Sequence, residues 1–287
     1  MFLYLGGYIM NIPIFQYAIF MVAYLALLLF IVDFMRKNYK FANLFWIGTL
    51  LTFPLWLMGG VQGWFRWSKI LSVILPTIFL GFCRIATYEN RKGKVWENIQ
   101  KNWVLWFFYG ILFLNIMEAT VKDITLGNYF NAATGFLLCA TIPFAPKFWK
   151  FQKDQVGDLI VYTTIGWNLL YTTWNACFVY AESPKYFAAS LCIILAAEIY
   201  PLLKGRPELY VISRVYTLAT HVIIRASVPW LFPLLMDASS WQNPTILKYW
   251  GIINFCLIVP YLFWYLWNLH TGKAYESFIR SNKTTSY

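Results

Sequence analysis

The sequence has few charged residues for its length, and this scarcity argues against a soluble fold. Only 12% of the 287 residues are Asp, Glu, Lys or Arg, whereas soluble domains carry about 25%. Hydrophobic residues make up 60% of the chain, and its mean hydropathy is +0.55. A chain of this composition belongs in a lipid bilayer, so we expect an integral membrane protein.

Residue types that carry metal, cofactor or nucleotide chemistry are also scarce or absent. His221 and His270 are the two histidines of the chain, too few for a multi-histidine zinc or iron site. The five cysteines show no CxxC spacing. Every lysine falls between apolar segments or in the tail, which excludes a retinal Schiff base. The motifs GxxxxGKS/T, GxSxG and HExxH are missing as well. We therefore expect no cofactor and no metal centre.

About nine apolar segments follow one another, most of them close to the ~20 residues that a helix needs to cross the hydrocarbon core. We expect transmembrane helices over residues 8–32, 41–60, 70–87, 103–120, 129–145, 159–181, 187–203, 209–235 and 246–269. The fifth is interrupted by Asn131 and ends at Pro143 and Pro146, so a re-entrant segment is the alternative there. No linker divides the chain, and residues 1–287 are expected to form one all-α, polytopic helix bundle.

The basic residues indicate the orientation of this bundle. They gather in every second connection and in the tail: Arg36, Lys37 and Lys40, then Arg91, Lys92, Lys94 and Lys101, then Lys147, Lys150 and Lys153, then Lys204 and Arg206, and finally Lys273, Arg280 and Lys283. The positive-inside rule then places the N-terminus outside and the C-terminus in the cytoplasm. The net charge of +11 is thus a topology signal, and we expect no nucleic-acid partner. A plasma membrane or a bacterial inner membrane is the simplest location.

The eighth segment, 209–235, carries four polar residues at helical spacing. Arg214, Thr217, His221 and Arg225 fall on one face of a helix. An arginine near the centre of a membrane helix costs about 2.5–3.5 kcal/mol, so such residues normally face a polar interior and have a function. We expect the two arginines to bind an anionic group. His221 is a candidate proton carrier or catalytic acid–base residue, and a hydrogen-bonded interior histidine is the alternative.

The sixth segment, 159–181, is polar along one face. Asn168, Asn175 and Glu182 recur every seven residues, which is nearly two helical turns, and the polar line is expected to begin near Asp158. The adjacent strip is aromatic and suited to wall an apolar or cationic ligand pocket: Trp167, Tyr171 and Trp174. We expect this face and the eighth segment to enclose a hydrated cavity. The alternative is that the asparagines only join helices through hydrogen bonds.

Charged side chains inside a membrane bundle are expected to pair with one another. If the helices concerned are neighbours, Glu198 pairs with Arg214 near the cytoplasmic side, and Glu118 pairs with Arg225 toward the outer side. For the first of these pairs, the alternative role is only to fix the order of the helices.

These features predict a membrane transporter or permease for a small polar or anionic molecule, with a pathway between the sixth and eighth helices and proton coupling as an option. The substrate-binding candidates are Arg225, Arg214, Asn168, Asn175, Trp167, Trp174, Tyr171, Glu182 and Glu198. The first alternative is an intramembrane enzyme for a lipidic or isoprenoid substrate, with His221 and Glu118 as catalytic candidates. The second is a membrane sensor or accessory subunit. The expected partners are the lipid bilayer and a small-molecule or ion substrate, and a homo-oligomer is left open.

Overall fold

The computed structural model describes residues 12–153, 155–274 and 276–278, and in this part the chain is dominated by helices. Residues 8–11 of the first expected span and the basic tail residues Arg280 and Lys283 lie outside the described residues. Six described helical segments are long and apolar enough to cross a membrane: Ile14–Lys37, Tyr39–Met58, Arg66–Tyr88, Trp103–Thr125, Pro184–Leu203 and Pro244–His270. The all-α class expected from composition is therefore confirmed, and the helices are compatible with an integral membrane protein.

The helices follow the apolar segments of the sequence closely. Those that build the bundle are α1 (Ile14–Lys37), α2 (Tyr39–Thr49), α3 (Phe53–Met58), α4 (Trp64–Tyr88), α6 (Trp103–Thr125), α7 (Tyr129–Ala140), α8 (Ile165–Glu182), α9 (Phe187–Leu203), α10 (Tyr210–Ser227) and α12 (Pro244–His270). Two short helices, α5 (Lys94–Asn98) and α11 (Leu231–Met236), lie in connections. Large apolar side chains are exposed along the outer helices, among them Ile14, Phe30, Phe263 and Trp267, which suits a lipid-facing surface.

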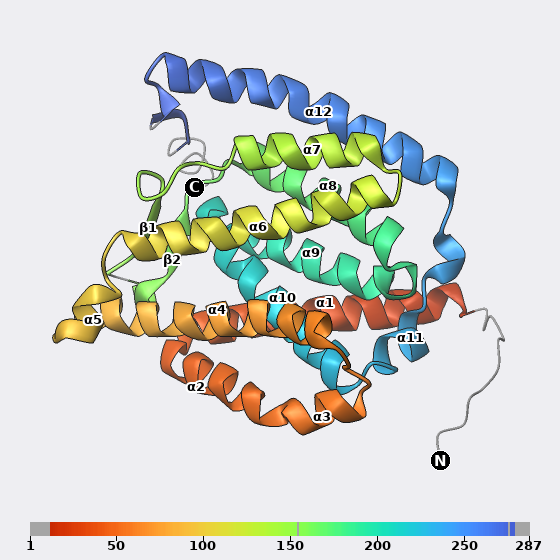
Figure 1. The fold of residues 1–287 in the computed structure, drawn as a ribbon, viewed down its shortest axis with the longest axis horizontal. Coiled ribbons are helices and arrows are strands. Elements are labelled where there is room, and N and C mark those ends of the chain that lie inside the picture. Colours follow the sequence, from red (N-terminus) through yellow and green to blue (C-terminus); the bar gives the residue numbers. More distant parts are fainter. Residues whose placement is uncertain (1–11, 154, 275, 279–287) are drawn as a thin grey trace.

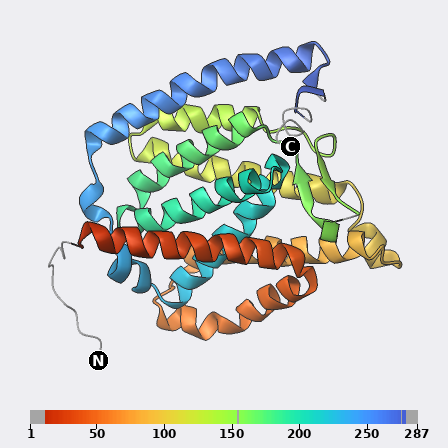
Figure 2. The ribbon, with the colours of Figure 1, turned by 180° about the vertical axis from the view of Figure 1, so that it is seen from behind.

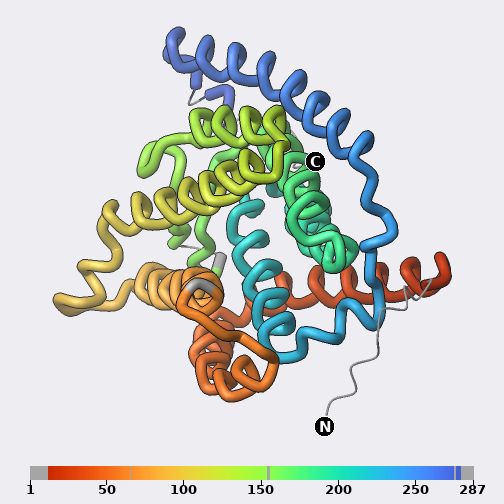
Figure 3. Tube along the Cα trace, turned by 45° about the vertical axis from the view of Figure 1, so that its right-hand side comes forward, coloured from red at the N-terminus to blue at the C-terminus, as the bar shows by residue number. Residues whose placement is uncertain are grey.

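The axes of most helices are roughly parallel or antiparallel to one another, with α12 at one edge of the bundle and α2 with α3 at the opposite edge (Figure 1). The view from behind shows α1 crossing the back of the bundle (Figure 2). Helix α10 runs through the middle of the molecule (Figure 3), where it packs against α9, α4 and α1. Helix α8 packs against α9, α12 and α7. The two helices with the most polar faces, α8 and α10, therefore lie inside the bundle.

The start of the sixth expected span is not helical. Residues Leu159–Val161 form strand β2, which pairs antiparallel with β1 (Trp149–Phe151) in a small hairpin. Helix α8 begins only at Ile165, where the Thr164 hydroxyl accepts a hydrogen bond from the Trp167 backbone N–H at 3.1 Å, as an N-cap residue does. The expectation that Asp158 starts the polar face of this helix is thus wrong, because Asp158 lies in the hairpin.

The eighth expected span is not one continuous helix either. Helix α10 ends at Ser227, and α11 starts after a turn at Val228–Trp230. The cause is Pro229, which lacks the backbone N–H that a continuing helix needs and restricts the residue before it to extended conformations. All four polar residues of this segment precede the break, so α10 alone carries them.

Candidate functional site

Polar side chains from α8, α9 and α10 meet inside the bundle around Glu198. This glutamate of α9 is buried, and its Oε2 accepts a hydrogen bond from the Thr172 hydroxyl of α8 at 2.9 Å. The Tyr210 hydroxyl, at the start of α10, lies 3.0 Å from the same Thr172 oxygen. No Lys or Arg among the described residues forms an ion pair with Glu198. The carboxylate is thus bound by a neutral hydroxyl group, which Tyr210 contacts in turn.

Arg214 lies one helical turn after Tyr210 on α10 and also faces α8. Its Nη2 donates to Asn175 Oδ1 at 2.9 Å, and its guanidinium carbon lies 5.9 Å from the centre of the Tyr171 ring. Its Nε and Nη1 are buried and have no hydrogen-bond partner within the described part of the chain. The expected ion pair with Glu198 does not form, because Asn175 takes the place of the carboxylate beside Arg214.

The C-terminal half of α10 carries His221 and Arg225. His221 Nδ1 lies 3.2 Å from the Tyr24 hydroxyl of α1, the ring stacks on Phe232 at 4.7 Å, and Nε2 is buried without a partner in the described residues. The Arg225 guanidinium lies over the Tyr186 ring at 3.9 Å. Like Arg214, it forms no ion pair within the ranges that the structure describes.

Together these side chains form a line that follows α10 from its first turn to its last. We call this set the polar column: Glu198, Thr172, Tyr210, Asn175, Arg214, His221 and Arg225. Tyr171 borders it, stacked on Trp167 at 5.2 Å and packed against Trp174 at 5.6 Å. Thr217, also on the polar face of α10, donates to the Arg214 carbonyl at 3.2 Å. The column brings together most of the residues that the two polar faces suggested.

Four of the expected site residues lie apart from the polar column. Glu118 is half-exposed on α6 and pairs with Lys69 Nζ at 3.4 Å, so the expected pair with Arg225 is wrong. Asn168 donates to the Pro207 carbonyl at 3.3 Å. Trp174 donates from Nε1 to the Asn131 carbonyl at 2.9 Å, on the α7 side of α8. Glu182 accepts a hydrogen bond from the neighbouring Ser183 hydroxyl.

A second polar cluster, which the sequence did not identify, surrounds Asp158 of the hairpin. Asp158 is fully buried between Arg84 of α4, whose Nη2 lies 3.2 Å from Oδ1, and Arg36 of α1, whose Nη2 donates to Oδ2. Arg84 also donates to the Tyr216 hydroxyl at 2.6 Å, and Arg36 to the Tyr200 hydroxyl at 2.6 Å. We call these five residues the Asp158 cluster. The sequence assigned Arg36 only to a basic connection, and nothing in its spacing indicated that the hairpin would fold back onto it.

A third cluster lies between α6, α7, α8 and α12. Asp123 is fully buried and accepts hydrogen bonds from Asn128 Nδ2 at 3.1 Å and from Asn131 Nδ2 at 2.7 Å. Asn131 Oδ1 accepts from Asn254 Nδ2 at 2.8 Å, and Asn254 Oδ1 accepts from the Thr173 hydroxyl of α8 at 2.9 Å. We call these five residues the Asp123 cluster. The sequence pointed only to Asn131, as an interruption of an apolar run.

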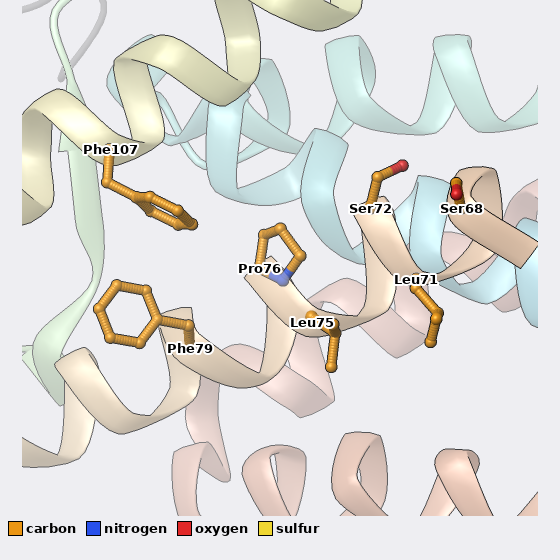
Figure 4. A pocket seen from close by; sticks show the side chains of 7 residues that line it. All are labelled: Ser68, Leu71, Ser72, Leu75, Pro76, Phe79 and Phe107. Carbon is orange, nitrogen blue, oxygen red and sulfur yellow. The ribbon is translucent and has the colours of Figure 1, made fainter.

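The remaining surface offers a shallow groove between α4 and α6. Figure 4 shows the side chains that line it: Ser68, Leu71, Ser72, Leu75, Pro76, Phe79 and Phe107. Its lining is mostly apolar and contains no charged residue, so it does not extend the polar column. In the described ranges, no group of three or more His, Cys, Asp or Glu side chains is placed to hold a metal ion.

The polar column is accordingly the candidate site of this protein. It contains hydrogen-bond donors, a carboxylate, and two arginines that have no acidic partner among the described residues. Comparison of the chain with protein-family models, with curated proteins and with solved structures finds no match.

Proposed function

We propose that the protein is a membrane transporter or permease for a small anionic or polar molecule, and that the polar column lines its pathway. In this proposal nine passes cross the bilayer, with α2 and α3 counted as one, and the C-terminus is cytoplasmic. The arrangement of the connections supports this topology. Figure 1 shows α5, the β1–β2 hairpin and the C-terminal end of α12 at one end of the bundle, and these are the connections that carry the basic runs.

The observation that carries the proposal is the state of Arg214. A guanidinium inside a membrane bundle is costly unless it is paired with a carboxylate and its N–H groups are hydrogen-bonded. Arg214 has one neutral partner, Asn175, and its buried Nε and Nη1 have none among the described residues. Each of these two nitrogens can donate to an oxygen of a carboxylate or phosphate, the groups that arginine binds most strongly. An anionic group of the substrate thus completes the site.

The other members of the polar column give a path to and from this position. Arg225 lies near the outer end of α10, with only the Tyr186 ring against it, and attracts an anion from that side. His221 lies one turn deeper, and Arg214 follows about two turns further along the helix. Glu198 and Thr172 close the cytoplasmic end through Tyr210. In this order Arg225 attracts an anion at the entrance. Glu198 repels it at the opposite end, where the anion is released.

The experiment is a flux assay in proteoliposomes with a panel of labelled small anions and polar solutes. We expect uptake of at least one class, lost with Arg214→Gln and with Arg225→Ala, while both variants remain monodisperse in detergent. The matched control is Arg66→Gln, because Arg66 is exposed in the first turn of α4 and donates to the nearby Gly60 carbonyl at 3.2 Å. Unchanged flux in Arg214→Gln would refute the pathway.

The geometry gives less support to an intramembrane enzyme. His221 contacts Tyr24 and Phe232, whereas Glu118 pairs with Lys69 on a half-exposed surface. An acid and a base that act on one substrate must both reach the reacting atoms, and among the described residues the partners of these two differ. Turnover of a lipid by the purified protein, lost in His221→Ala, would favour the enzyme over the transporter.

A further inference from the structure

Asp123 is a buried carboxylate with no cation beside it. It lies at the C-terminal end of α6, is fully buried, and its oxygens accept hydrogen bonds only from Asn128 and Asn131 within the described residues. None of the ion pairs of the described chain includes it. Removal of an ionised carboxylate from water without a paired cation is unfavourable, and uptake of a proton removes the charge.

The helices packed around Asp123 supply no other charge to the cluster. Among the described residues, a titratable side chain that contacts the cluster is Cys177 of α8, whose sulfur lies 3.6 Å from Asn128 Nδ2. The charged or titratable residues nearest in sequence on α6, α7 and α12 are exposed: Glu118, Lys122, Tyr129, Lys248, Tyr249 and Cys256. A proton compensates the charge with one carboxylate oxygen and one acceptor, whereas a metal cation needs several oxygen ligands, and Asn131 keeps an N–H group directed at the carboxylate.

The two asparagines that contact Asp123 differ in their freedom to rotate. Asn131 is fixed, because its Oδ1 accepts from Asn254 at 2.8 Å and its Nδ2 also lies 3.2 Å from the Trp174 carbonyl. Asn128 has no such second bond on its oxygen, which lies against Gly251 of α12, where an added Cβ would be 2.8 Å away. Rotation of the Asn128 amide by half a turn brings its oxygen toward Asp123, and an amide oxygen accepts the hydrogen bond of a protonated carboxyl.

We infer that Asp123 is a proton-binding site of this protein. The proton binds the Asp123 oxygen that faces Asn128, Asn128 turns from donor to acceptor, and Asn131 keeps its bond to the other oxygen. The change reaches α8 at Cys177, because the Asn128 Nδ2 that turns away lies 3.6 Å from the Cys177 sulfur, and Thr173 and Trp174 of the same helix are held by Asn254 and Asn131. The neighbouring residues of α8, Thr172 and Asn175, contact Glu198 and Arg214 of the polar column.

Helix α8 thus lies between the Asp123 cluster on one side and the polar column on the other. Two residues of this turn, Thr172 and Asn175, face the column. The two between them, Thr173 and Trp174, face the Asp123 cluster. A small rotation of α8 on protonation would therefore reposition the partner of Arg214. The coupling of proton to substrate rests on the proposed function, whereas proton binding by Asp123 does not.

The test is an infrared titration of the purified full-length protein in lipid nanodiscs. All samples carry Glu198→Gln, because Glu198 is also buried and forms no ion pair among the described residues. In this background we expect a band from a protonated, non-aqueous carboxyl group that appears as the pH falls and is absent when Asp123→Asn is added. The control is Glu118→Gln, which removes an exposed carboxylate of the same helix and should keep the band. Persistence of the band with Asp123→Asn in a folded protein, or its absence from the Glu198→Gln protein at every pH at which it stays folded, would overturn the inference.

A second variant tests the role of Asn128 while it retains the carboxylate. Gly251→Ala places a Cβ against the Asn128 oxygen and should hinder the rotation, so that proton binding weakens by about tenfold, the equivalent of one lost hydrogen bond. An unchanged midpoint would refute the rotation. Because the titration needs no substrate, a normal titration together with no flux of any solute would overturn the proposed function and leave the proton site intact.

Discussion

Two pairs of arginines lie inside this bundle in opposite electrostatic situations. Arg36 and Arg84 share Asp158 and are further bound by tyrosine hydroxyls and backbone carbonyls. Arg214 and Arg225 have no carboxylate partner among the described residues and rest on Asn175 and on aromatic rings. The first pair has its charge balanced by the protein. The charge of the second pair is not balanced by an acidic side chain of the described residues.

The difference is the one expected between a structural role and the proposed binding role. The Asp158 cluster ties together elements that are distant in sequence, since α1, α4, the hairpin, α9 and α10 each contribute a residue. A buried ion pair of this kind adds little net stability over an apolar core, but removal of one partner is costly because it strands the other charge. An unpaired buried arginine lowers stability, and the proposed binding of an anion would account for its presence here.

The largest effect on stability is expected from Arg84→Met. The variant removes one of the two guanidiniums that balance Asp158 and leaves the carbonyls of Met35, Arg36 and Val156 without their donor. We expect the free energy of unfolding to fall by about 3–5 kcal/mol, the usual cost of breaking a buried pair. Denaturant unfolding of the protein in detergent micelles measures it.

The control for this variant is Arg66→Met at an exposed position, which should change the free energy of unfolding by no more than about 0.5 kcal/mol. If Arg84→Met were as mild as this control, the Asp158 cluster would not hold the bundle together. The distinction between the two pairs of arginines would then fail.

Arg214→Met makes the same substitution in the pair of arginines that has no carboxylate partner among the described residues. Methionine fills a similar volume without the unpaired charge, and the main loss is the hydrogen bond to Asn175 at 2.9 Å. Relief of the buried charge and loss of this bond act in opposite directions. We expect the free energy of unfolding to stay within about 1 kcal/mol of the wild type, or to rise, while flux is lost. A loss of stability as large as that of Arg84→Met would show that Arg214 is structural.

The sequence predicted the helices well because their signal is local. Hydropathy alone placed the span 187–203, and α9 occupies Phe187–Leu203. The polar faces of α8 and α10 were also visible, since seven-residue and four-residue spacings fix which side chains share a face. Where the prediction failed, at residues 159–164 and 228–230, the cause was a strand pairing and a proline turn inside apolar sequence.

The partners of the charged residues could not be predicted in the same way. The sequence suggested pairs by depth, and Glu118 and Glu198 do lie on helices of the bundle, but the side on which each helix presents its charge depends on packing. The most strongly paired acid, Asp158, lies in a hairpin whose return onto α1 and α4 involves contacts about 75 to 120 residues apart in the chain. Local periodicity carries no information on such contacts.

The smallest effect on stability is expected from the ion pairs of Glu89, which are in contact with water. Glu89, just after α4, accepts from Lys40 Nζ at 2.8 Å and from Arg91 Nε at 2.7 Å. These two cations lower the pKa of Glu89 to about 2. Because the folded value lies below the ordinary value of 4.5, the stabilisation is present above that pH and is lost as the pH falls toward the folded pKa.

Glu89→Gln should therefore lower the free energy of unfolding by at most about 1 kcal/mol at neutral pH, since exposed pairs are screened by solvent. Comparison of melting temperatures of wild type and variant across acidic pH measures the effect, and we expect the two curves to converge as Glu89 is protonated in the wild type. A difference that persisted unchanged at the acidic end would mean that Glu89 acts through packing. A difference as large as that of Arg84→Met would show that burial does not set the cost of breaking an ion pair in this protein.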